Sequence, residues 1–374
     1  MRKIAIDLGY GYVKGIADNG RTTLFPAVVG PVAKRALAEL LPKANVKPVD
    51  EGLHIATHGA DGIWTEYFVG ELAQRESRIV SAIFDDDKVQ HPAATAMLAA
   101  ALTQLTDPTD TELLLVTGLP LGQYAVYKDR FEKFLRGLSI DARVYSRDGS
   151  FTTRHFRDIT AHVLPQGAGA AYDILMRNRT AITWGANSLV GVIDIGHKTT
   201  DIIVFDVAAP DKNGVPGLRP VDSLSFSINT GMSVLHEQIG AIYQERVEYI
   251  PRPIDIEQMV IGGGHRVVFG STLDFSAEIR ITANSLAEYI RSLAIERWNA
   301  RMADFSAVFL AGGGASLLHD QLRRLHKNIK VVVADDAQFA NARGYLAVAT
   351  GLAALATRNN VTQIQRNPIA NERI

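Results

Sequence analysis

One arrangement of residues occurs twice in this chain, and it limits the possible folds more than any other feature. Residues 3–16 comprise an apolar strand that ends at Asp7, a glycine turn and a second apolar strand. Residues 189–205 repeat this order, with Asp194 near the end of the first strand and a polar loop at 196–201. Two such units, separated by roughly half the chain, predict two similar α/β domains that face one ligand.

The second hairpin indicates the kind of ligand. Gly196 permits close backbone approach, Thr199 and Thr200 offer hydroxyl groups beside the loop amides, and Asp194 adds a carboxylate. This set suits a phosphate with bound magnesium, because magnesium prefers oxygen ligands. From this stretch alone, an ordinary hairpin with a polar turn is an equally good interpretation.

A dinucleotide-binding fold is the rival explanation of the first hairpin. Gly9 and Gly11 resemble the start of its glycine fingerprint. However, Lys14 replaces the third fingerprint glycine, and the residues after the turn are not patterned as a helix. The acidic Asp7 just before the glycines also favours a metal-bridged phosphate over a bare pyrophosphate. The rival therefore fits the first hairpin less well.

Composition sets the outer limits. With 374 residues, 47% hydrophobic and 21% charged, the chain can bury sizeable cores and is expected to form about two domains. A net charge of −1 gives no long-range attraction for nucleic acid, so we expect no direct DNA binding. The absence of cysteine excludes disulfides and thiolate metal sites. No apolar leader and no run of about 18 apolar residues is present, so we expect a cytoplasmic protein without a membrane segment.

The remaining patterns predict the other elements. Strands are expected at 21–29, 53–55, 67–69, 112–119, 144–159, 224–228 and 307–310, helices at 32–41, 91–105, 124–138, 232–243 and 315–325, and a loop at 210–220. The helix at 232–243 follows Gly231, and its N-terminal amides are expected to face an anion or a sugar. Gln166 precedes a small-residue helix where the chain crosses between its halves. Gly312, Gly313 and Gly314 form a turn that lets a flat ring or phosphate lie against bare backbone.

The order of these motifs resembles the actin superfamily. Its phosphate-1, connect-1, phosphate-2, adenosine and connect-2 motifs are similar, in that order, to the Asp7 hairpin, the Gln166 crossover helix, the Asp194 hairpin, the glycine turn at 312–314, and the residues 341–344 that open an alanine-rich helix. The match spans nearly the whole chain. Within the superfamily, the sequence looks most like the ParM/StbA group of bacterial and archaeal plasmid-segregation actins.

The resemblance implies an architecture and an activity. It implies an α/β fold of two actin-like, ribonuclease-H-like domains with a nucleotide cleft between them. Domain I would be 1–165 plus 340–374, with a small insertion at about 31–82, and domain II would be 166–339, with a helix-rich insertion at about 229–301. It also implies ATP hydrolysis with Mg²⁺, head-to-tail polymerisation, and plasmid segregation through a DNA-binding adaptor protein. GTP stays open as a second nucleotide.

The resemblance also implies roles for particular residues. Asp7 and Asp194 would hold the metal, and Asp194 would help Gln166 to activate and orient the attacking water. The nucleotide would be bound by the two hairpins and the glycine turns, that is by Gly9, Tyr10, Gly11, Tyr12, Lys14, Gly196, His197, Lys198, Thr199, Thr200, Gly231, Gly312, Gly313 and Gly314.

The amino-acid sequence alone does not explain two departures from the family pattern. Tyr10 replaces a small polar residue, and His197 and Lys198 stand where a small residue or a second glycine is common. Lys198 could add positive charge near phosphate. We assign His197 and Lys198 no catalytic role.

Other functions occur within the same superfamily, so the fold does not decide the activity. A sugar kinase needs a carboxylate base, whereas Gln166 cannot take a proton and favours hydrolysis. A chaperone would add a peptide-binding domain, for which the polar tail at 358–374 leaves no room, and that tail has too few apolar residues to bind a bilayer as cell-division relatives do. A filament-forming ATPase therefore ranks first, and a non-polymerising regulatory ATPase or small-molecule kinase is the alternative.

Overall fold

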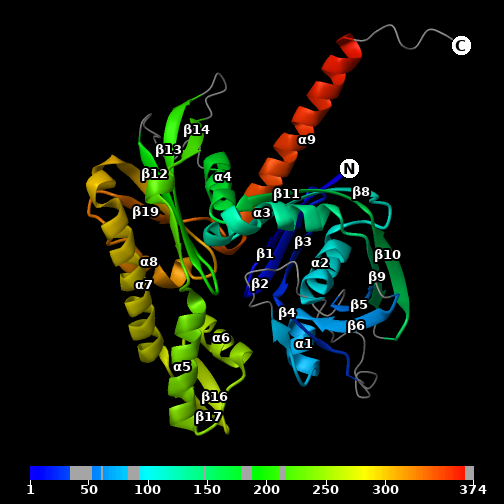
Figure 1. Cartoon of the computed structure of the whole chain (residues 1–374). Helices are drawn as coiled ribbons and strands as arrows, with labels where there is room; N and C mark the ends of the chain where they lie inside the picture. Colours follow the sequence, from blue (N-terminus) through cyan, green and yellow to red (C-terminus); the bar gives the residue numbers. More distant parts are fainter. Residues whose placement is uncertain are drawn as a thin grey trace, which may run out of the picture.

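The computed structural model has two α/β lobes joined by a pair of crossing helices (Figure 1). It describes residues 1–33, 53–59, 62–82, 92–146, 148–177, 188–210 and 216–366. The helix predicted at 32–41 lies almost wholly outside these residues. The predicted α/β architecture with two lobes is confirmed, while the domain boundaries stay predictions.

The first lobe is built on a five-stranded sheet in the order β11-β8-β1-β2-β3. β1 pairs in parallel with β8 and antiparallel with β2, so the first hairpin lies at the centre of the sheet. The bounds are β1 (Arg2–Leu8), β2 (Tyr12–Ala17), β3 (Thr22–Pro26), β8 (Glu112–Leu119) and β11 (Asp158–Pro165).

A second sheet in the same lobe has the order β10-β9-β5-β6-β4-β7. Helix α2 (Pro92–Leu105) packs between the two sheets, because its many alanines allow both to approach closely. Helix α1 (Gly70–Glu76) covers β4 and β6, and α3 (Leu121–Arg136) packs on β11. The strands are β4 (Val28–Pro31), β5 (His54–His58), β6 (Trp64–Val69), β7 (Ser81–Ala82), β9 (Ile140–Tyr145) and β10 (Phe151–Phe156).

The second lobe repeats this plan around a sheet in the order β14-β13-β12-β18-β19, with β15 paired to β13. Its strands are β12 (Leu189–Ile195), β13 (Thr200–Pro210), β14 (Pro216–Pro220), β15 (Phe226–Ile228), β18 (Phe305–Ala311) and β19 (Lys330–Val333). Again the central strand β12 is parallel to one neighbour, β18, and antiparallel to its hairpin partner, β13. Helix α8 (Ala315–Leu322) contacts β18 and β19.

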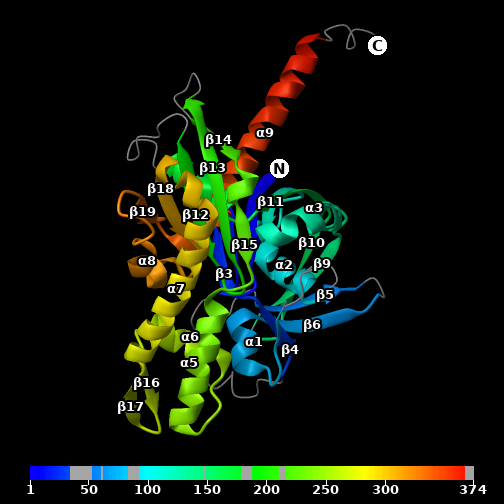
Figure 2. The same ribbon diagram turned by 60° about the vertical axis from the view of Figure 1, so that its left-hand side comes forward.

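The predicted helix-rich insertion forms an arm that extends from the second lobe (Figure 2). It contains α5 (Met232–Val247), α6 (Pro253–Ile261) and α7 (Ser276–Trp298). The sequence did not reveal the hairpin at the far end of the arm, formed by β16 (His265–Val268) and β17 (Ser271–Asp274). These strands are short and flanked by glycines, so their pattern was too brief to separate from a loop.

Two helices cross between the lobes, α4 (Ala168–Arg177) and α9 (Ala340–Arg366). At the crossing the backbones touch, since a Cβ atom on Gly344 would lie 1.7 Å from the carbonyl oxygen of Gly169. Arg343 adds ion pairs to Asp173 at 2.7 Å and Asp336 at 2.9 Å. The tail expected from residue 358 is partly wrong, because α9 continues to Arg366 and projects beyond both lobes in Figure 1.

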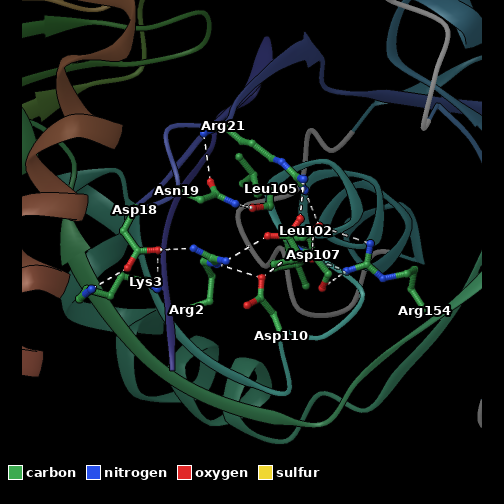
Figure 3. Close-up of polar contacts among 11 residues, drawn as sticks. Arg2, Lys3, Asp18, Asn19, Arg21, Leu102, Leu105, Asp107, Asp110 and Arg154 are labelled. Atoms are coloured by element: carbon green, nitrogen blue, oxygen red, sulfur yellow. Dashed lines mark hydrogen bonds and ion pairs between the residues drawn. The ribbon is translucent and has the colours of Figure 1, made fainter.

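Arginine side chains cap the C-terminal end of α2, as Figure 3 shows. Arg21 donates to the carbonyl oxygen of Thr106 at 2.8 Å, and Arg154 donates to the Thr106 hydroxyl at 2.7 Å. Arg2 pairs with Asp110 at 2.8 Å, which ties β1 to the loop after the helix. Cationic groups at a helix C-terminus stabilise it by about 0.3–1 kcal/mol each. This network therefore fixes the end of β1 that lies away from Asp7.

Three strand predictions need correction. The β segment expected at 144–159 covers the end of β9, all of β10 and the start of β11, which belong to two sheets. The strand expected at 21–29 is two strands in different sheets: Pro26 ends β3, and the N–H of Ala27 donates to the carbonyl of Gly11 at 2.8 Å, so the chain turns before β4. The loop expected at 210–220 contains β14, which pairs with β13. Within the described part of the chain, no helix is long and apolar enough to cross a membrane.

Candidate nucleotide-binding site

The turns of the two central hairpins have the same geometry. In the first, the N–H of Gly9 donates to the carbonyl of Tyr12 at 3.1 Å, and in the second the N–H of Gly196 donates to the carbonyl of Thr199 at 2.9 Å. The turns also meet, since a Cβ atom on Gly11 would lie 2.9 Å from the Cβ of His197. Glycine at position 11 therefore lets the two hairpins come into contact.

Asp7 lies at the end of β1 and is 2% exposed. Its carboxylate accepts hydrogen bonds from the Lys14 ammonium at 3.0 Å and from the Gln166 amide at 2.8 Å. Burial alone would lower the pKa of Lys14, but the carboxylates of Asp7 and Asp194 raise it above its ordinary value. Lys14 is therefore a buried permanent cation beside Asp7.

Asp194 occupies the matching position at the end of β12. Its carboxylate accepts a hydrogen bond of 2.6 Å from the amide of Asn341, at the start of α9. Burial, with the nearby charge of Asp7, raises the pKa of Asp194 to about 6, although Lys14 and Asn341 oppose the rise. The pair of buried carboxylates thus carries more negative charge than its surroundings neutralise.

Both carboxylates face a cavity of about 620 Å³ between the lobes, a size within the usual range for small-molecule sites. The predicted site residues that line it are Asp7, Gly9, Tyr10, Gly11, Tyr12, Lys14, Gln166, Asp194, Gly196, His197, Thr199, Gly312 and Gly313. The structure therefore brings both hairpins, the crossover glutamine and the later glycine turn to one cavity.

The glycine turn after β18 presents bare backbone to this cavity. Gly312 has φ of +83°, and a Cβ atom there would lie 2.3 Å from the carbonyl oxygen of Ile195. No larger residue fits that position without moving the second hairpin. A Cβ atom on Gly313 would meet no atom within 4 Å beyond its own residue and its two chain neighbours, so its open side leaves room for a ligand.

Four predicted site residues do not line the cavity: Lys198, Thr200, Gly231 and Gly314. The Thr200 hydroxyl donates to the carbonyl of Thr230 at 2.8 Å. Gly231 and Gly314 are backbone packing positions, where a Cβ would lie 2.6 Å from the Gly196 oxygen and 2.5 Å from the Ile195 side chain, respectively. Their contribution to nucleotide binding stays a prediction.

The N-terminus of α5 does not present its first amides to a ligand, contrary to expectation. The N–H of Met232 donates to the carbonyl of Gly196 at 3.0 Å, and that of Ser233 donates to the carbonyl of His197 at 2.8 Å. These two amides satisfy the hairpin carbonyls and so brace the turn from behind.

Several residues of the site were missed. Asn341 was noted only as part of a motif, yet it also accepts hydrogen bonds from the N–H groups of Gly167 and Ala170 at 2.9 and 3.1 Å. Asp201 stands opposite Asp194 in the hairpin register, and burial raises its pKa to about 7. Asp201 occupies the position in the second hairpin that Lys14 occupies in the first, and this equivalence was the signal available in the sequence.

Glu257 of α6 and His236 of α5 also line the cavity and carried no sequence signal. Glu257 hydrogen-bonds the phenol of Tyr12, and burial raises the pKa of both groups. The ring centroids of His236 and His197 are 5.8 Å apart, and burial, with His197 nearby, lowers the pKa of His236 to about 4. Both residues belong to the insertion, and they reach the cleft only because the arm folds against it.

Comparison with protein families agrees with this geometry. Residues 5–169 match the family of actin-like proteins, N-terminal domain, and residues 192–324 match the C-terminal family of archaeal MreB-like actin homologues. An archaeal actin homologue of Thermoplasma acidophilum is 25% identical over 350 residues, covering 91% of this chain and 97% of that protein. Its counterpart from Thermoplasma volcanium is 25% identical over 356 residues, with the same coverage.

Solved structures show the same likeness. A 15-stranded ParM filament from Clostridium botulinum is 27% identical, with a TM-score of 0.80 over 94% of this chain and 99% of that one. A non-polymerisable quadruple mutant of pCBH ParM is 25% identical, with a TM-score of 0.79 and the same coverage. An archaeal actin homologue solved in complex with ADP, 19% identical, has a TM-score of 0.74 over 94% of this chain and 99% of that one.

The fold and the paired hairpins define a two-lobed protein of the actin-like ATPase class. The chain belongs to the actin superfamily, as a ParM-like member.

Proposed function

We propose that this chain is a cytoplasmic ATPase that binds ATP with Mg²⁺ in the cleft, hydrolyses it and polymerises head to tail. The observation that carries the proposal is the meeting of two equivalent glycine turns, each next to a buried aspartate, in one cavity. Such turns direct backbone N–H groups at phosphate oxygens. The archaeal homologue solved with ADP supports a nucleotide as the ligand. GTP stays the alternative nucleotide.

The residues present fit a magnesium ion. Asp7 and Asp194 are buried, and the charge of Asp7 disfavours ionisation of Asp194, which a divalent cation would relieve. Among the described residues no three His, Cys, Asp or Glu side chains form a cage. Magnesium does not need one, since it usually takes one or two carboxylates and completes its shell with water and phosphate oxygens. When bound, the metal would neutralise phosphate charge.

The chain's own residues divide the remaining work. Lys14 and the amides of the two turns would bind the β- and γ-phosphates, and Gly312 and Gly313 would border the nucleoside. Gln166 donates its amide to Asp7, which leaves its carbonyl oxygen to accept a hydrogen bond from the attacking water. Asp194 would accept a proton from that water, because burial raises its pKa toward neutrality.

The arm supports the assembly part of the proposal. Its far end carries exposed apolar side chains in the loop after α5 and in the β16–β17 hairpin: Tyr249, Ile250, Val267 and Phe269. Phe269 is 87% exposed and has φ of +46°, a strained backbone conformation for a bulky residue. The insertions at 31–82, part of which lies outside the described residues, and at 254–301 are proposed as contacts between neighbours. Assembly of the Clostridium botulinum relative into a filament agrees with this.

We propose plasmid or other DNA segregation as the role of such filaments. The net charge of −1 does not favour direct binding to DNA, so the proposal includes a DNA-binding adaptor protein. The ParM relatives support this role by family likeness alone.

Sedimentation and light scattering with and without ATP and Mg²⁺ test the proposal. Wild-type protein should pellet reversibly above a critical concentration, and electron microscopy of the pellet should show filaments. Phe269→Asp should block pelleting and keep ATP affinity, whereas Val126→Asp on α3 is the exposed control. If the wild type binds ATP but stays monomeric at micromolar to tens of micromolar concentrations across a range of salt, the alternative is favoured. Glu257, a carboxylate lining the cavity, would then be the candidate base of a kinase.

A further inference from the structure

The two departures from the family pattern lie against each other across the cleft. The ammonium of Lys198, in the turn of the second hairpin, is 4.7 Å from the ring centroid of Tyr10, in the turn of the first. This is a cation–π geometry. Two substitutions that have no explanation separately are thus partners in one contact.

Tyr10 is held in position by its own lobe. Its hydroxyl oxygen accepts a hydrogen bond of 2.5 Å from the amide of Gln123, on α3, and the side chain is buried. The ring therefore presents a fixed face to Lys198. Beside it, the close approach of Gly11 to His197 keeps the two turns in van der Waals contact.

The two lysines of the hairpins have different partners. Lys14 lies 3.0 Å from the Asp7 carboxylate and lines the cavity. Lys198 lies over an aromatic ring and is not among the cavity-lining residues. The contact with Tyr10 therefore directs the Lys198 side chain toward the opposite hairpin.

We propose that Tyr10 and Lys198 form a clasp that holds the two phosphate hairpins together and limits opening of the cleft, so that both are positioning residues and Lys198 is not a phosphate ligand. The hairpins belong to different lobes, so a bound nucleotide can leave only when they separate. Breaking the clasp makes that separation easier and shortens the residence of the nucleotide. This inference rests on the proposed nucleotide site for its kinetic consequence, while the contact between Tyr10 and Lys198 involves protein atoms alone.

The kinetic test uses fluorescent ATP with Mg²⁺. Lys198→Met should raise the release rate about threefold to tenfold, and single-turnover hydrolysis should fall by a smaller factor. Lys198→Arg should restore slow release, because a guanidinium also stacks on the ring. The matched control is Lys128→Met on α3, which removes a cation–π contact with Tyr124 outside the cleft. A larger loss in hydrolysis than in residence, with no rescue by arginine, would make Lys198 a phosphate ligand and overturn the clasp.

A double-mutant cycle tests the partnership. Tyr10→Leu should raise release by a similar factor, and Tyr10→Leu combined with Lys198→Met should add little to either change. Tyr10→Phe keeps the ring and should stay closer to the wild type. Independent, additive effects would refute the clasp.

A measurement without nucleotide separates the clasp from the proposed function. In ligand-free protein, hydrogen exchange of the amides in both turns, residues 9–12 and 196–199, should speed up in Lys198→Met and not in Lys198→Arg. If exchange changes in this way but ATP does not bind the wild type, the clasp stands and the nucleotide proposal fails. If ATP binds normally and exchange is unchanged in Lys198→Met, the clasp fails and the nucleotide proposal stands.

Discussion

The two central hairpins share one backbone plan but differ in the residue that faces the aspartate. In the first, Asp7 pairs in register with Lys14. In the second, Asp194 pairs in register with Asp201. Both turns are closed by the same type of hydrogen bond, so the difference is one of charge and not of backbone geometry.

This difference gives the two halves different electrostatic tasks. The first hairpin neutralises its own carboxylate through an ion pair of 3.0 Å. The second buries two carboxyl groups, and burial raises the pKa of Asp194 to about 6 and of Asp201 to about 7. A site with one internal cation and an excess of buried acid is prepared for a further cation. The second half is therefore where metal or proton binding should have its largest effect.

Each aspartate also receives an amide from a crossing segment. Gln166, just before α4, donates to Asp7 at 2.8 Å, and Asn341, in α9, donates to Asp194 at 2.6 Å. Only Gln166 lines the cavity. Asn341 uses its oxygen to hold the N-terminus of α4, so it serves the crossing of the helices.

The largest expected effect comes from the glutamine of this amide pair. Gln166→Ala should keep ATP affinity and lose about 10- to 1000-fold in turnover, because orienting water matters mainly in the transition state. Its filaments should outlive those of the wild type. Calorimetry with a phosphate-release assay measures both quantities, and Gln258→Ala, at an exposed position on α6, is the control. An equal loss of binding would assign Gln166 a structural role.

The cation of the first hairpin should have the next largest effect. Lys14→Met removes a buried charge that both Asp7 and a phosphate would use, and charge-assisted hydrogen bonds contribute about 1.5–3 kcal/mol. ATP affinity should therefore fall by about 100-fold in calorimetric titration. A loss below about threefold would mean that the first hairpin does not bind phosphate through this lysine.

The carboxylates themselves come third. Asp7→Ala or Asp194→Ala should weaken magnesium-dependent binding or turnover by at least tenfold, or about 1.4 kcal/mol. Titrations with ATP in magnesium and in EDTA show how much of the loss depends on the metal. Because the second hairpin holds the excess of buried acid, Asp194→Ala should remove more of the magnesium dependence of ATP binding than Asp7→Ala. Unchanged affinity and turnover in both variants would rule out the site.

The sequence predicted the parts of the site that depend on local pattern. The strand at 112–119 was correct to the residue, and both hairpins formed where apolar runs flank glycine turns. One cavity contains Asp7, Asp194 and Gln166. Ligand sites in α/β folds form at the carboxyl ends of the central strands, where both aspartates lie and where the crossover begins. The motif order, read against a known family, supplied the rest of the architecture.

What the sequence could not predict are contacts between segments far apart along the chain. Glu257 reaches the cavity only because the arm folds back to the cleft, and the Tyr10–Lys198 contact joins residues from different lobes. Neither position belongs to a periodic pattern. The strand at 216–220 was missed because prolines at both ends resemble a loop, although an edge strand tolerates them.

The smallest effect, and the most direct probe of the difference between the hairpins, concerns Asp201. In the folded protein its pKa is about 7, against about 3.9 for an ordinary aspartate, so between these values the folded state binds a proton that the unfolded state lacks. Ionisation of Asp201 therefore lowers the free energy of unfolding as pH rises from about 4, and this loss is complete above about pH 7.

Asp201→Asn removes the charge but keeps an oxygen to accept a hydrogen bond from the N–H of Leu121, which lies 2.9 Å from the carboxylate. The test is urea unfolding in EDTA without nucleotide. At pH 8 the free energy of unfolding of the variant should exceed that of the wild type by at least about 1 kcal/mol, and this difference should become smaller toward pH 5. Other titrating groups are the same in both proteins, so they largely cancel in the difference. If the gain were equal at both pH values, Asp201 would carry no raised pKa and the second hairpin would hold no excess of acid beyond Asp194.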